Sequence, residues 1–155
     1  MILIADCAAV SIFDPKQNVI ALVHGGWRGT VGRIIQKSIS IMNEVFGCDP
    51  SDILVGVGPS IGPCCYEVKE DVISIFQKEF PQQAQHFFVP KGNERIHLDM
   101  WTALRYQILG SGIRPDHIEE SGICTACHLD EFYSYRAERG KTGRFAGLLV
   151  LRSAT

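Results

Sequence analysis

A chain of 155 residues with 46% hydrophobic and 21% charged residues has the composition of one globular domain with a hydrophobic core. Its formal net charge is −2 and no block of like charge occurs, which argues against a nucleic-acid or membrane-surface partner. No apolar run approaches the ~20 residues of a membrane span, and the N-terminus lacks the pattern of a signal peptide. We therefore expect a single domain over residues 1–155, located in the cytoplasm.

The first part of the chain alternates strand and helix patterns. Residues 2–14 are apolar at nearly every position, as in a strand covered on both faces, and Asp14 and Pro15 then predict a turn. A second strand is predicted over 19–26. Residues 30–46 place apolar side chains on one face of a helix.

The alternation continues to the C-terminal end, so the expected class is α/β or α+β. The chain has neither a G-x-G-x-x-G segment nor a Walker loop, which argues against a dinucleotide or P-loop site. Helices are predicted over 67–80 and 98–112. Strands are predicted over 52–60, 86–90, 117–125 and 143–151.

A thiol and an imidazole are predicted to meet where the first two strands end. If these strands form a hairpin with Pro15 and Lys16 at its tip, Cys7 faces His24. Opposed residues on one face have Cβ atoms about 4.5–5.5 Å apart, which suits two ligands of one zinc ion. A longer turn would shift this register, and a second interpretation makes Cys7 a buried apolar residue and His24 a hydrogen-bonded one.

The segment "HGGWRGT", residues 24–30, adds a possible anion site. Gly25 and Gly26 let a backbone or ligand approach closely. Arg28 lies where the strand gives way to the helix, and a guanidinium there can hold a phosphate through two parallel bonds. The alternative is an ion pair between Arg28 and a nearby carboxylate.

The remaining cysteines form a weaker pattern. The segment "CTACH" contains Cys124, Cys127 and His128, and "PCCYEV" contains the adjacent pair Cys64 and Cys65. A structural zinc normally takes four ligands, often as two spaced pairs, and the adjacent pair has no spacer. We interpret Cys64 and Cys65 as packing residues, with a zinc knuckle as the less favoured alternative.

The segments "ADCAAV", "HGGWRGT", "GPSIGPCCYEV", "LDMWTALRYQI", "CT" and "FYSYRAERGKTGRFAGLLVL" occur in this order and together resemble the YfiH-like family, also described as the laccase-domain or polyphenol oxidase family. The resemblance extends over residues 5–151. It implies an α/β/β/α layered sandwich and a metal held by one cysteine and two histidines, with Cys7 and His24 at two of these positions. The family's other histidine precedes "ADC", so we expect the chain to lack the N-terminal part of the domain. The remaining histidines match no metal position of the family; they are His86, His97, His117 and His128.

The resemblance implies a zinc-dependent purine nucleoside phosphorylase with adenosine deaminase as a side activity. The expected substrates are phosphate and adenosine, inosine or methylthioadenosine, and a homodimer is one expected assembly. The implied catalytic residues are Cys7, His24 and Arg28. The implied substrate-binding residues are Arg28, Gly58, Tyr135 and Arg136. The loop that carries Tyr135 and Arg136 has two other interpretations, a solvated turn and a surface that stacks on nucleic-acid bases.

Three other functions stay open. Oxidation of phenols by copper is an older description of the family, but the weak axial methionine of such sites is not evident, since Met42 and Met100 fall within helices. One branch of the family is linked to hydrolytic editing of peptidoglycan precursors. With two protein ligands in place of the usual three, the chain would be a non-catalytic fragment or half of a paired assembly.

Overall fold

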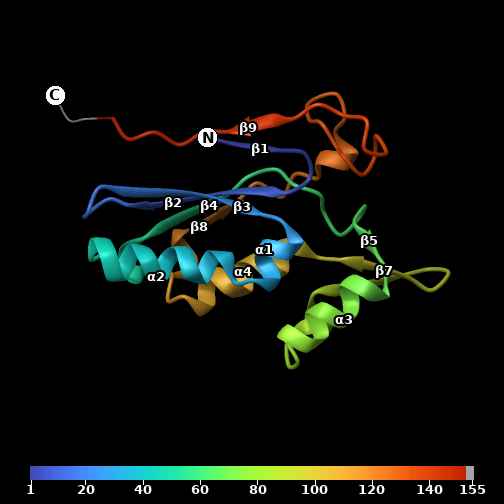
Figure 1. Cartoon of the computed structure of the whole chain (residues 1–155), viewed down its shortest axis with the longest axis horizontal. Helices are drawn as coiled ribbons and strands as arrows, with labels where there is room; N and C mark the ends of the chain where they lie inside the picture. The colour runs from blue at the N-terminus through green and yellow to red at the C-terminus, as the bar shows by residue number, and fades with distance from the viewer. Residues whose placement is uncertain (153–155) are drawn as a thin grey trace.

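The computed structural model describes residues 1–152, whose helices and strands form successive layers (Figure 1). A mixed four-stranded sheet lies in the middle, with helices beneath it and a two-stranded sheet above it in the view of Figure 1. The middle sheet has the order β3 (Val19–Gly25), β2 (Ala8–Asp14), β4 (Leu54–Val57) and β8 (Ile118–Glu120). Residues 1–152 thus supply one helical layer and two sheets of the expected α/β/β/α sandwich.

The predicted first strand is divided between the two sheets. β1 (Ile2–Ile4) pairs antiparallel with β9 (Phe145–Gly147) in the upper sheet, whereas β2 begins at Ala8 in the middle sheet. The chain changes sheet at Asp6, whose φ of 82° lies in the left-handed region. A continuous strand over 2–14 is therefore wrong, because a residue with positive φ cannot continue an extended ladder.

The two faces of β2 pack differently. Ala8, Val10 and Ile12 are buried in the core together with residues of the helical layer. Ala9 points the other way, toward the upper sheet, since a Cβ placed on Gly147 of β9 would lie 2.9 Å from the Ala9 Cβ. Alternation of side chains along β2 thus assigns even positions to the core and odd positions to the space between the sheets.

The β2–β3 hairpin differs from the predicted register by two residues. Ala9, not Cys7, is paired with His24, because the turn contains the four residues 15–18 instead of two. The Asp14 carboxylate accepts hydrogen bonds from the backbone N–H groups of Lys16 (2.8 Å) and Gln17 (3.0 Å), which stabilises the wider turn. A shift of two residues keeps every side chain on its predicted face.

The helix predicted over 30–46 is two helices. α1 (Trp27–Val31) ends before Arg33, which has a φ of 56°, and α2 (Ile34–Phe46) follows. The Arg33 guanidinium donates to the Glu79 carbonyl (2.9 Å) and stacks on the Phe80 ring at 4.7 Å. These tertiary contacts account for a break that the helical periodicity of the sequence does not show.

The remaining elements mostly follow the predicted order. The other helices are α3 (Glu70–Glu79), α4 (Met100–Gly110) and four single 3₁₀ turns, η1 (Pro50–Asp52), η2 (Ala84–His86), η3 (Pro115–His117) and η4 (Thr125–Cys127). A third sheet has the order β5 (Glu67–Val68), β7 (Arg95–Leu98), β6 (Phe88–Lys91). Of these, β5 and β7 were not predicted, and β5 lies in the range 67–80 that was predicted as one helix. β8 and β9 are shorter than their predicted ranges. Within residues 1–152, no helix is long and apolar enough to span a bilayer.

Candidate functional site

The candidate site lies where the chain passes from the upper sheet to the middle sheet, at Asp6. Asp6 is buried, and its carboxylate accepts hydrogen bonds from the Thr125 hydroxyl (2.8 Å) and the Arg136 backbone N–H (2.7 Å). Its carbonyl accepts a third hydrogen bond, from the Ile61 N–H (2.8 Å). A non-glycine residue with positive φ costs on the order of 1 kcal/mol, and these three bonds offset that cost. Asp6 therefore holds three separate loops around its neighbour, Cys7.

Cys7, directly before β2, and His24, in β3, line one cavity of about 370 Å³. Ala9 opposes His24 in the ladder, and Cys7 lies two residues before Ala9, directly before the start of β2. A Cβ placed on Gly26 would lie 2.9 Å from the Cys7 Sγ and 3.8 Å from the His24 Cδ2. The absence of a side chain at Gly26 thus leaves room for the thiol and the imidazole to approach each other.

The environment of Cys7 favours the neutral thiol when no cation is bound. Burial raises the pKa of the Cys7 thiol, the nearby charge of Asp6 raises it further, and Arg144 lowers it. Because the thiolate is the form that binds metals, a metal ion at this position has to displace the thiol proton.

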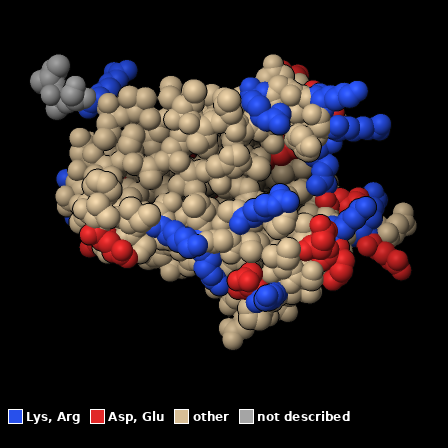
Figure 2. Space-filling view, in the orientation of Figure 1, with Lys and Arg blue, Asp and Glu red and all other residues tan. Residues whose placement is uncertain are grey.

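Arginines give the cavity a positive character. Arg28, Arg136 and Arg144 all line it, and its one acidic lining residue is Asp6, whose carboxylate is already hydrogen-bonded. Among residues 1–152, no carboxylate forms an ion pair with any of these three guanidiniums. Figure 2 shows basic side chains over the part of the molecule that holds the loop between β8 and β9, in which Arg136 and Arg144 lie. The alternative role of Arg28 as an ion-pair partner is therefore not seen, and the cavity suits an anion.

Three aromatic rings also line the cavity: Trp27, Tyr66 and Tyr135. The Arg28 guanidinium stacks on Trp27 at 4.3 Å and that of Arg136 on Tyr66 at 5.0 Å, which orients both cations. Burial raises the pKa of Tyr66 to about 12, so its hydroxyl is protonated at neutral pH and can donate a hydrogen bond. The cavity thus combines flat apolar faces with cationic groups.

The positions of Gly58 and Met100 relative to the cavity differ from those predicted from the sequence. Gly58 does not line this cavity, and its N–H donates to the Ala9 carbonyl (2.9 Å), while Ser60 and Ile61 form the nearby wall. Met100, the first residue of α4, does line the cavity, so its position in a helix does not separate it from Cys7 and His24. Four further lining residues were not predicted, although they lie within the motifs of the family resemblance; they are Asp6, Trp27, Tyr66 and Arg144.

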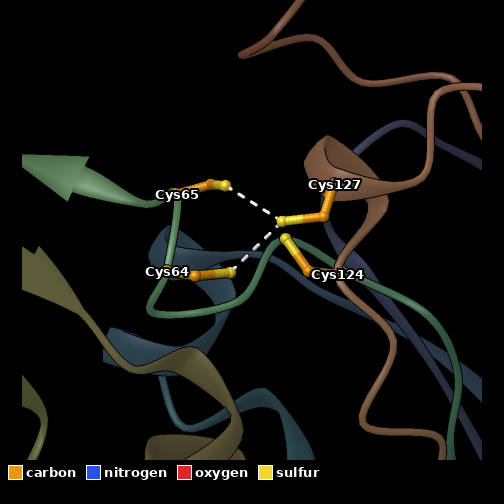
Figure 3. A group of neighbouring side chains, drawn as sticks. All are labelled: Cys64, Cys65, Cys124 and Cys127. Atoms are coloured by element: carbon orange, nitrogen blue, oxygen red, sulfur yellow. Dashed lines mark hydrogen bonds between the residues drawn. The ribbon is translucent and has the colours of Figure 1, made fainter.

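The interpretation of Cys64 and Cys65 as packing residues is wrong. Cys64 is exposed and Cys65 half-buried, and both sulfurs point toward Cys127 (Figure 3). The Sγ atoms of Cys64, Cys65, Cys124 and Cys127, here called the four-cysteine cluster, all lie within 4.8 Å of one another. Among residues 1–152, this is the one group of three or more His, Cys, Asp or Glu side chains so arranged. No third such side chain of this part of the chain therefore joins Cys7 and His24.

Comparison with known proteins places these features in a family. Residues 1–152 match the family described as multi-copper polyphenol oxidoreductase laccase. The chain is 37% identical to a protein named purine nucleoside phosphorylase from Bacteroides thetaiotaomicron, over 94% of this chain and 54% of that protein. It is 34% identical to purine nucleoside phosphorylase YlmD from Geobacillus stearothermophilus, over 96% of this chain and 54% of that protein.

Solved structures agree with the sequence comparisons. The fold matches the Bacillus licheniformis hypothetical protein YfiH with a TM-score of 0.86 and 34% sequence identity, covering 92% of this chain and 53% of that one. It matches YlmD from Geobacillus stearothermophilus with a TM-score of 0.85. The chain spans about half the length of the curated relatives it matches. It belongs to the family described as multi-copper polyphenol oxidoreductase laccase, as the YfiH-like resemblance of its motifs predicted.

Proposed function

We propose that this chain carries the metal-binding and phosphate-binding groups of a zinc-dependent purine nucleoside phosphorylase. One observation carries the proposal: a thiol–imidazole pair, three arginines and three aromatic rings line a single cavity of about 370 Å³. That volume falls within the range of about 300–1,000 Å³ typical of small-molecule sites. Relatives at 37% and 34% identity carry the name purine nucleoside phosphorylase, which supports the same activity.

The donor atoms suit zinc. A cysteine sulfur and a histidine nitrogen are both common zinc ligands, and a catalytic zinc usually has three protein ligands and one open position. Cys7 and His24 would be two of the three, the third being absent from residues 1–152. When bound, zinc would supply a Lewis acid that polarises a substrate oxygen or lowers the pKa of a bound water.

The arginines would bind and orient phosphate. In phosphorolysis a phosphate oxygen forms a bond to the ribose anomeric carbon while the bond to the purine nitrogen breaks, which gives ribose 1-phosphate and the free base. Arg28 can offer two parallel N–H groups to phosphate, because it has no carboxylate partner within residues 1–152. Arg136 and Arg144 would add charge that offsets the negative charge of the reacting phosphate.

The aromatic rings would hold the purine. A purine stacks favourably on a flat ring, and Trp27, Tyr66 and Tyr135 supply such faces in the same cavity. Deamination of adenosine would be a side reaction at this site, with activated water attacking the purine C6. The cytoplasmic location predicted from the sequence remains part of this proposal.

The test is phosphate-dependent release of the base. The natural gene product is incubated with adenosine or inosine, with and without phosphate, and the products are separated by chromatography. We expect free base and ribose 1-phosphate only when phosphate is present, and inosine from adenosine without it. Phenol oxidation that depends on copper, with no nucleoside cleavage by the zinc-loaded protein, would contradict the proposal and support the polyphenol oxidase alternative.

A further inference from the structure

The four-cysteine cluster has the spacing of a metal site. The Sγ of Cys127 lies 3.6 Å from that of Cys64 and 3.4 Å from that of Cys65. A tetrahedral zinc with Zn–S bonds of about 2.3 Å places its sulfurs about 3.8 Å apart. A disulfide would require about 2.05 Å, so these sulfurs are spaced for a shared ion.

Two loops present the sulfurs from opposite sides. Cys64 and Cys65 lie in the loop between β4 and β5, whereas Cys124 directly precedes the η4 turn after β8 and Cys127 is the last residue of that turn (Figure 3). The loops are already joined by backbone contacts, since the Ser60 N–H donates to the Ile123 carbonyl (3.1 Å). Ser60 also forms an isolated parallel bridge with Cys124. The four ligands are therefore positioned before any metal binds.

Further hydrogen bonds orient the ligands. The Gly62 N–H donates to the Cys124 Sγ at 3.2 Å, a contact that strengthens when the sulfur is a thiolate. His97 is hydrogen-bonded through Nδ1 to the Pro63 carbonyl (2.8 Å), directly before the Cys64–Cys65 pair. Such supporting bonds fix the direction of metal ligands in known sites.

We propose that Cys64, Cys65, Cys124 and Cys127 bind one structural zinc ion, separate from the Cys7–His24 pair. Four thiolates are soft donors that suit zinc, which binds four cysteines in many structural sites. Binding releases the four thiol protons to solvent and leaves a centre with a net charge of −2. All four positions are filled by protein, so this zinc has no open position for a substrate.

The ion would connect a loop that lines the cavity with a loop that holds Asp6 in place. Tyr66, which follows Cys65, lines the cavity. Thr125, which follows Cys124, donates to the Asp6 carboxylate beside Cys7. A zinc that crosslinks the two loops would thus act as a positioning device for the neighbouring site without contacting substrate.

Zinc content after dialysis tests this proposal in a variant that lacks the other site. The protein carrying Cys7→Ser and His24→Ala is expected to keep about one zinc per chain, whereas the same protein with Cys64→Ser and Cys65→Ser added should lose it. Cobalt in the first variant should give an intense sulfur-to-metal absorption band of the strength of four thiolates. Because the first variant is expected to keep its zinc whether or not the nucleoside chemistry is correct, the two proposals fail separately.

A conservative exchange guards against misfolding. Cys127→His replaces one zinc ligand with another and should retain zinc, with a weaker cobalt–sulfur band from three thiolates. Cys127→Ser should lose the ion while keeping the far-ultraviolet circular dichroism of the wild type. The assignment is overturned by iron in place of zinc, by a disulfide within the cluster, or by four freely reacting thiols in the zinc-supplemented Cys7→Ser, His24→Ala protein.

Discussion

The Cys7–His24 pair and the four-cysteine cluster are both built on thiols, but they differ in the number of donors and in their surroundings. The pair lines a cavity with three arginines and three aromatic rings, and residues 1–152 give it two metal donors. The cluster gathers four sulfurs within 4.8 Å. A metal that keeps an open position can take part in chemistry, whereas one enclosed by four protein ligands holds a structure together. We therefore propose that the first region supplies the chemistry and the second supplies rigidity.

Removing the ligands of the pair should give the largest effect on activity. Cys7→Ser and His24→Ala should each lower kcat/KM for nucleoside phosphorolysis by about a thousand-fold or more, a loss at the upper end of that for one transition-state contact. Zinc analysis of the same proteins should show that the cluster ion remains. If either variant kept wild-type turnover, the chemistry would have to be placed elsewhere and the contrast between the two regions would disappear.

Arg28 tests whether the cavity binds phosphate. A charge-assisted hydrogen bond contributes about 1.5–3 kcal/mol, so Arg28→Ala should raise the KM for phosphate by about 10- to 150-fold. The KM for the nucleoside should change much less. The matched control is Arg114→Ala, which removes an exposed ion pair with Asp116 outside the cavity and should leave both constants unchanged.

Gly26 tests the close approach of the thiol and the imidazole. A methyl group there would lie 2.9 Å from the Cys7 Sγ, and the φ of −94° imposes no backbone strain on alanine. Gly26→Ala should therefore weaken zinc binding at the pair by about tenfold, equivalent to about 1.4 kcal/mol, with little change in stability. Competition with a chromophoric chelator measures this. Gly92→Ala is the control, since no atom lies within 4 Å of its added methyl group. Equal affinities in both variants would show that the pair does not share an ion beside Gly26.

The placement of the pair shows what strand patterns can and cannot predict. A two-residue turn would pair Cys7 with His24. The Asp14 side chain stabilises a four-residue turn instead, and Ala9 is paired with His24. The error is an even number of residues, so both side chains stay on the face that was predicted. Turn length thus decides the register, and alternation alone decides the face.

Breaks in regular structure were not visible in the sequence. Asp6 and Arg33 both have positive φ, and each is held by contacts with residues distant in the chain, such as Thr125 and Glu79. Local propensity carries no information about these partners. A long apolar run therefore predicted one strand where two sheets meet, and a helical period predicted one helix where two form.

The cysteines illustrate the same limit at a site. Spacing disfavoured a zinc knuckle because Cys64 and Cys65 are adjacent, but the loops carrying them and Cys127 fold against each other. The spacing of ligands along the chain describes each pair of cysteines separately and does not show which pairs come together. Which pairs meet depends on the order of strands in the sheet, here the parallel pairing of β4 with β8 that brings their following loops together.

The smallest effect on activity is expected from the cluster. Cys127→Ser should lower the free energy of unfolding by about 2–3 kcal/mol, the stabilisation that a ligand gives when present at about a hundred times its Kd. Phosphorolysis should fall by less than tenfold, because the Ser60–Ile123 hydrogen bond and the Ser60–Cys124 bridge still join the two loops. Urea unfolding with and without a chelator measures the first quantity, and Cys127→His should restore it. A loss of activity as large as that of Cys7→Ser, with zinc still bound at Cys7 and His24, would mean that the cluster takes part in the chemistry and that the two regions are one site.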